Sequence, residues 1–137
     1  MRRIDISFLL LAALCLVTGV VMGIAMGIAH AFQLAPVHAH FNLVGWASLA
    51  IFGLVYKVYP ALAQSRLALA HFWLSGPTAI LFPIGIYLAM TYEFLPLAVG
   101  ASMLWLAGAV LFLANLLRLF LFASGPLRAP EGREALA

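Results

Sequence analysis

The chain has 137 residues, of which 66% are hydrophobic and only 8% are charged, and its formal net charge is +3. A water-soluble domain of this length could not cover its surface with so few polar side chains, so the composition excludes a soluble globular protein. At about 20 apolar residues for each membrane crossing, the chain has room for four crossings and for no separate soluble domain.

Four apolar stretches are long enough to span the hydrocarbon core of a bilayer. They cover about 7–29, 37–59, 67–90 and 95–122. Proline-containing sequences mark the breaks, at Ala35-Pro36, Pro60, Pro96 and Ser124-Gly125-Pro126. We therefore predict a four-transmembrane-helix domain over 1–126 and a polar cytoplasmic tail over 127–137. The first stretch lacks an obvious cleavage site, which favours a retained helix over a signal peptide.

The first stretch carries glycines at intervals of four, at Gly19, Gly23 and Gly27. This spacing aligns them on one face of a helix, where another backbone can approach closely. Packing inside the protomer is the favoured interpretation, and a contact between subunits is the alternative.

All the lysines and arginines fall on one side of the predicted spans, at Arg2, Arg3, Lys57, Arg66, Arg118, Arg128 and Arg133. The positive-inside rule places that side, with both termini, in the cytoplasm. These basic residues lie at segment ends rather than in one patch, so they indicate orientation and not binding of nucleic acid.

Three of the four histidines, His30, His38 and His40, lie within eleven positions around the first outer loop. A histidine in or beside a membrane span suggests a function, and imidazole is a frequent ligand of metals and of haem iron. The single Cys15 provides no thiol cluster. A metal or haem site is therefore predicted here, with His38 and His40 as principal ligands. Three roles stay open for His30: a metal ligand, a residue that supports a ligand, or a side chain that is simply solvated.

Residues two apart on a helix differ by about 200° in direction. His38 and His40 should therefore point to opposite faces, and they cannot both bind one haem within a single chain. In a lone monomer, one ring would face lipid or solvent, whereas in an oligomer each ring can face a cleft lined by a neighbour. The HxH spacing thus favours a homo-oligomer.

His71 begins the third span from the cytoplasmic side, so its depth differs from that of His40 by roughly 20 Å. One iron cannot bridge that separation. A structural or interfacial role beside Phe72 and Trp73 is favoured for His71 over a role in proton relay.

The run His38-Ala39-His40-Phe41-Asn42-Leu43-Val44-Gly45-Trp46, continuing through Ala50-Ile51-Phe52-Gly53 to Tyr59-Pro60, resembles subunit I of the haem-copper oxidases. The likeness is to small bacterial relatives with four helices, and it extends to His71-Phe72-Trp73-Leu74 and Gly76. The resemblance implies an all-α, integral membrane four-helix bundle equivalent to one third of subunit I. It also implies a multi-pass protein of the bacterial inner (cytoplasmic) membrane.

The resemblance further implies a homotrimer that rebuilds the twelve-helix ring. His38 of one protomer and His40 of the next would then share a cleft that holds haem b. The chain departs from the family in lacking a match to the His-Tyr segment near the oxidase copper, and Tyr56 and Tyr59 lie toward the cytoplasmic end, away from the histidines. No span carries a mid-membrane Asp, Glu or Lys, so proton-pumping oxygen reduction is not expected.

The leading functional hypothesis is a membrane b-type haem protein that transfers or stores electrons with an unidentified redox partner. One alternative is a haem protein that binds a diatomic gas. Another is copper binding by His30, His38 and His40, with Met22 and Met26 as soft ligands. The last is a structural accessory subunit of a respiratory complex. Enzymatic activity is left open, and if present it would be that of an oxidoreductase.

Overall fold

The computed structural model describes residues 3–122, and all the regular secondary structure in that range is helical. The elements in chain order are α1 (Ile4–Ala29), η1 (Phe32–Leu34), α2 (Ala35–His40), η2 (Phe41–Ser48), α3 (Leu49–Val58), α4 (Pro60–Ala63), α5 (Arg66–Tyr92) and α6 (Pro96–Phe122). The predicted all-α class is confirmed. The predicted tail over 127–137 lies outside the described residues.

Within the described residues, four helical segments are long and apolar enough to cross a membrane, as the sequence predicted. They are Ile4–Ala29, Phe32–Val58, Arg66–Tyr92 and Pro96–Leu121. The second of these is built from η1, α2, η2 and α3, which follow one another without interruption.

The first turn lies earlier in the chain than Ala35-Pro36, where the sequence placed it. The chain reverses after α1 at His30, which adopts a left-handed conformation with φ of 53°. Pro36 instead occupies the first turn of α2. A proline is tolerated there because the amide hydrogen it lacks would have no partner within the helix.

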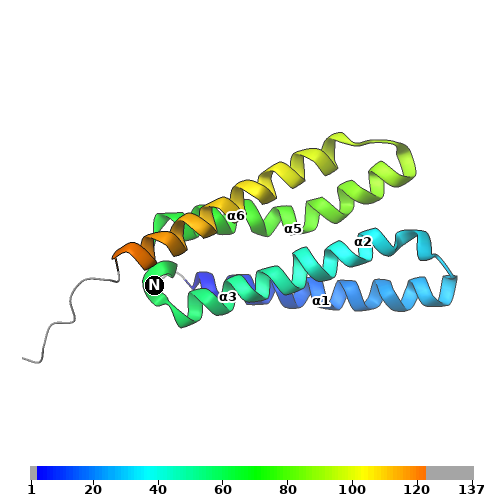
Figure 1. The fold of residues 1–137 in the computed structure, drawn as a ribbon. Helices are drawn as coiled ribbons and strands as arrows, with labels where there is room; N and C mark the ends of the chain where they lie inside the picture. Colours follow the sequence, from blue (N-terminus) through cyan, green and yellow to red (C-terminus); the bar gives the residue numbers. More distant parts are fainter. Residues whose placement is uncertain (1–2, 123–137) are drawn as a thin grey trace, which may run out of the picture.

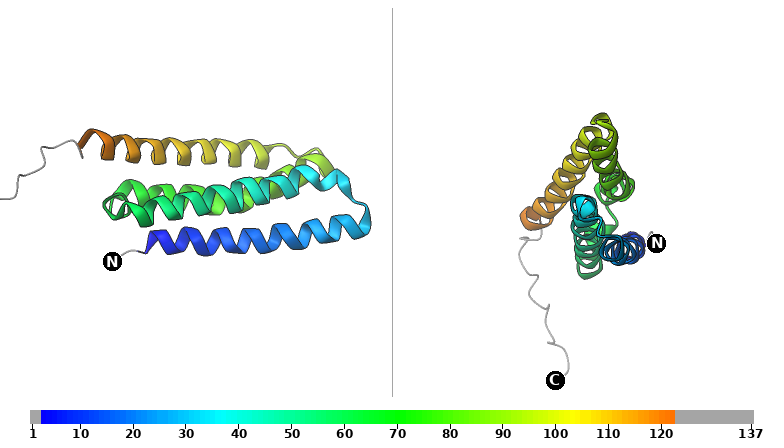
Figure 2. Two further views of the ribbon diagram at one scale, coloured as in Figure 1. Left: turned by 60° about the horizontal axis from the view of Figure 1, so that its bottom comes forward. Right: turned by 90° about the vertical axis from the view of Figure 1, so that its right-hand side faces the viewer.

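The helices pack as two antiparallel pairs (Figure 1). One pair joins α1 to the span that contains α2 and α3, and the other joins α5 to α6. Figure 2 shows α1 and α6 on opposite sides of a layer that contains α3 and α5. Only 11% of the most apolar stretch of α6 is buried. The bundle therefore presents a large apolar surface that lipid or further protein would cover.

A buried aromatic cluster lies toward the end of the bundle that carries the N-terminus. Phe8 of α1 is fully buried there, and its ring contacts those of Phe52, Tyr56, His71 and Phe72. Ser65 caps α5 at the same end, since its hydroxyl accepts a hydrogen bond from the Ala68 amide at 3.0 Å. This aromatic cluster joins α1, α3 and α5.

Candidate functional site

Two glycines of α1 accommodate polar side chains of the second span. A Cβ atom added at Gly19 would lie 2.7 Å from Asn42 Nδ2, and one added at Gly23 would lie 2.9 Å from His38 Cε1. At Gly27 an added Cβ would meet nothing within 4 Å in the described part of the chain. The favoured interpretation, packing inside the protomer, is therefore confirmed for Gly19 and Gly23.

His38 is half-buried and its ring lies against α1. Both ring nitrogens have only long contacts with Asn42 Nδ2, at 3.5 Å for Nδ1 and 3.4 Å for Nε2. The same amide donates a shorter bond of 2.9 Å to the His38 carbonyl oxygen. Asn42 therefore holds the backbone of His38 more firmly than its ring, and the ring nitrogens are not committed to a strong hydrogen bond with it.

His40 is also half-buried, but its ring lies against α5. It contacts the ring of Phe82 edge-on, with the centroids 4.9 Å apart. His40 Nδ1 lies 2.7 Å from the carbonyl oxygen of Pro36. A carbonyl oxygen can only accept, so Nδ1 carries the proton, and Nε2 of the neutral ring is left as an electron-pair donor. Many metal-binding histidines have this arrangement.

The two rings point to different faces of α2, as their spacing predicted. His38 faces α1 and His40 faces α5. We expected one ring of a lone chain to face lipid or solvent, and the structure instead leaves both rings partly exposed. Each ring is half-covered by a helix of its own chain, because Gly23 leaves room for His38 and Phe82 packs against His40.

His30 lies at the same end of the bundle but is exposed, and its ring stacks on Phe32 with centroids 6.2 Å apart. In the range 3–122, no group of three His, Cys, Asp or Glu side chains is placed to hold a metal ion. His30, His38 and His40 are thus neighbours at one rim without forming a three-ligand cluster in one chain. Of the two methionines considered as soft ligands, Met26 is buried and Met22 is half-buried.

A π-helical segment, η2, directly follows His40. Its wider turns are reflected in Ser48, whose hydroxyl donates to the carbonyl oxygen five residues earlier, that of Leu43, at 2.8 Å. Gly45 of this segment meets α1, where an added Cβ would lie 2.8 Å from Cys15 Cβ. Cys15 is therefore a packing residue. Segments of this kind are rare and frequently occur at functional sites. The sequence did not predict it.

A second polar cluster, Tyr56 and His71, lies at the opposite end of the bundle. Tyr56 Oη and His71 Nδ1 are 2.9 Å apart, and the two residues are 1% and 0% exposed. Tyr56 therefore lies at the opposite end of its span from His38 and His40, as expected, and it bonds to His71. His71 occupies the interior of the protomer, between the rings of Phe8 and Phe52, whereas the neighbouring Trp73 is exposed.

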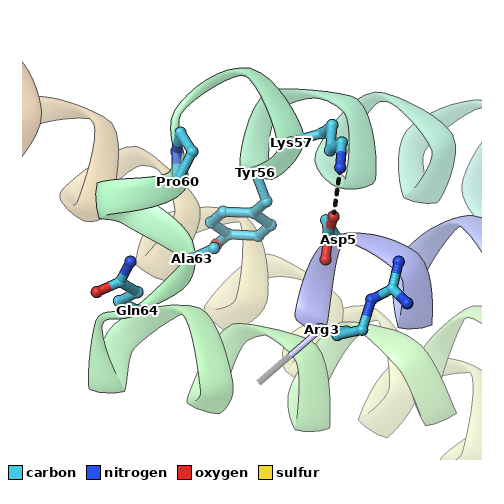
Figure 3. A pocket seen from close by; sticks show the side chains of 7 residues that line it. All are labelled: Arg3, Asp5, Tyr56, Lys57, Pro60, Ala63 and Gln64. Carbon is cyan, nitrogen blue, oxygen red and sulfur yellow. Dashed lines mark ion pairs between the residues drawn. The ribbon is translucent and has the colours of Figure 1, made fainter. Parts of the chain in front are cut away.

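A pocket of about 310 Å³ opens beside this cluster (Figure 3). It is lined by Arg3, Asp5, Tyr56, Lys57, Pro60, Ala63 and Gln64. Lys57 Nζ lies 3.8 Å from Asp5 Oδ2, and the lysine side chain is 64% exposed. Solvent screens so exposed an ion pair, which contributes little to stability. The pocket places charged side chains next to the buried Tyr56.

Comparisons with protein-family models, curated proteins and solved structures give no match to this chain. The likeness of the segment from His38 to Trp46 to haem-copper oxidases therefore stays a prediction from the sequence. A function must be argued from the chemistry of the two histidine sites themselves.

Proposed function

We propose that this chain is a membrane-bound b-type haem protein that transfers or stores electrons, and that His38 and His40 are the residues that would hold the haem. The observation that supports it is that two half-buried imidazoles at one end of α2 face opposite sides of the helix. One chain then contributes a single ligand to each of two sites. A neighbouring copy would contribute the second ligand to each.

The state of the ring nitrogens suits this role. The Nδ1–H group of His40 donates a hydrogen bond to the carbonyl oxygen of Pro36. This bond orients the ring and leaves Nε2 as a ligand atom. His38 has only long contacts from its ring nitrogens to Asn42, so it can exchange them for a stronger bond. When bound, haem would supply one-electron chemistry, with a potential set by the two imidazoles and the apolar surroundings.

The proposed assembly is a homotrimer in which three four-helix arcs close into a ring. The arrangement of α1 and α6 on opposite sides of the protomer, both with exposed apolar residues, gives each chain two outward faces for neighbours. With the orientation predicted from the basic residues, the haem sites would lie toward the outer side of the bacterial inner membrane and both termini in the cytoplasm.

Absorption spectroscopy of the full-length protein, purified in detergent, tests the haem proposal. We expect a Soret band, sharp reduced α and β bands, and a pyridine haemochrome typical of haem b. His38→Ala and His40→Ala should each abolish these bands, whereas His71→Gln should retain them. A folded, colourless protein that contains stoichiometric copper would overturn the proposal in favour of copper binding. Carbon monoxide binding to the reduced protein would indicate the gas-binding alternative.

The mass of the detergent-solubilised protein tests whether the site is shared. We expect a complex of three chains that dissociates, or loses its haem, when either ligand is replaced by alanine. A haem-containing protein with the mass of one chain would contradict the shared site while leaving haem binding intact. The two parts of the proposal can therefore fail separately.

A further inference from the structure

Two polar atoms in the interior of the bundle lack a hydrogen-bond partner among the described residues, His71 Nε2 and Ser75 Oγ. Their residues are 0% and 1% exposed. Burying a donor or acceptor without a partner costs free energy, so most such groups in native proteins bind another group or an ordered water molecule. Both atoms therefore need a ligand that can hydrogen-bond.

The two unpaired atoms lie on one face of one helix. His71 and Ser75 are four residues apart on α5, which places them on the same side with a rise of about 6 Å between them. Side chains one helical turn apart on the same face can reach a common point, and one water molecule can bond to two polar groups at nearly 3 Å each. The spacing of the two residues thus fits a single bridging water.

Among the described residues, aromatic side chains cover the other faces of the His71 ring. The elements packed against the ring are α1, α3 and α6, which present Phe8, Phe52 and Phe112 at centroid distances of 5.0, 4.5 and 5.3 Å. The titratable group that contacts it is Tyr56, which already bonds to Nδ1 at 2.9 Å. Phenyl rings cannot bond to Nε2, so that nitrogen is left for a small polar molecule.

We propose that a buried water molecule bridges His71 Nε2 and Ser75 Oγ. It completes a hydrogen-bonded chain from Tyr56 through His71 and the water to Ser75. Water both donates and accepts, so it complements Nε2 whether that atom carries the imidazole proton or not. Its site is polar on two sides and enclosed by aromatic rings.

This hydrogen-bonded chain begins beside the pocket that Arg3, Asp5 and Lys57 line, because Tyr56 forms part of the wall of that pocket (Figure 3). This water site does not depend on the haem proposal.

Nuclear magnetic resonance of the full-length protein in lipid nanodiscs, labelled with ¹⁵N-histidine, tests the site. The His71 ring signals are assigned by their loss in His71→Asn. We expect magnetisation transfer from water to the His71 ring in the wild type. Ser75→Ala removes one of the two ligands of the water and should weaken the transfer severalfold to about tenfold, as loss of one hydrogen bond implies.

Two alanine substitutions on α6 provide a matched pair. A Cβ at Gly108 would collide with Ser75 Oγ and displace it, whereas one at Gly100 would meet nothing within 4 Å in the described part of the chain. Gly108→Ala should therefore weaken the transfer and Gly100→Ala should leave it unchanged. Absence of transfer in the wild type would overturn the proposal, as would a signal unchanged in Ser75→Ala. If Gly108→Ala does not fold, Ser75→Ala decides alone.

Discussion

Gly23 on α1 and His38 on α2 are in direct contact, and a methyl group at position 23 would stand 2.9 Å from His38 Cε1. That separation is well below ordinary carbon-carbon contact, so either the ring or the backbone of α1 would have to move. The position of the His38 imidazole thus depends on the absence of a side chain on another helix.

Gly23→Ala should displace the His38 ring and lower the amount of haem bound per chain. Gly27→Ala is the matched control, because an added Cβ there meets nothing within 4 Å in the described residues. The haem-to-protein ratio, measured by pyridine haemochrome, checks the prediction. Equal haem content in the two variants would show that the Gly23 contact does not position a ligand.

His40→Met should keep haem bound and raise its reduction potential relative to the wild type. Methionine is an axial ligand whose replacement of histidine raises the potential of haem iron, and it can occupy a similar volume. His40→Ala, which offers no ligand atom, should lose the haem. A redox titration followed by absorption spectroscopy measures the shift. An unchanged potential with full haem content would mean that His40 is not a ligand.

Tyr56→Phe should destabilise the bundle by about 1–3 kcal/mol, because it leaves the buried His71 Nδ1 without its partner. Tyr59→Phe is the control, since Tyr59 lies three residues away and is exposed. Its stability should change little. Thermal unfolding in one detergent compares the two variants with the wild type. Equal stability of all three proteins would contradict a structural contribution from the Tyr56–His71 bond.

Phe8→Ala should destabilise the bundle more than Tyr56→Phe does. We expect the free energy of unfolding to fall by about 3–5 kcal/mol, because Phe8 is fully buried at the centre of the aromatic cluster. Leu10→Ala changes a side chain on the same helix that is exposed on the apolar surface. It should have only a small effect. The same unfolding assay applies, and a larger effect at Leu10 would place the lipid-facing surface of α1 in a contact between subunits.

The features that follow from composition and helical period could be predicted from the sequence. The four spans follow from the lengths of the apolar stretches. The opposite directions of His38 and His40 follow from the rotation of about 200° between residues two apart on a helix. The turn before the second span was misplaced because a proline beside a helix start resembles a proline in a loop.

Contacts between helices could not be predicted in the same way, because they depend on register and tilt. The bond between Tyr56 and His71 joins α3 to α5, and no periodicity in either segment signals it. The contact between α1 and the His38 ring could not be predicted from periodicity either. Three glycines four residues apart indicated close approach, but they did not indicate which side chain would fill the space.

The π-helical segment η2 sets the angular phase between the two halves of the second span. One residue more or fewer in a regular helix turns everything beyond it by about 100°. His38 and His40 lie before η2 and Tyr56 lies after it. Deleting one residue within Phe41–Ser48 would therefore rotate the two histidines relative to Tyr56. The wide turns thus allow a single continuous helix to direct His40 toward Phe82 at one end and Tyr56 toward His71 at the other.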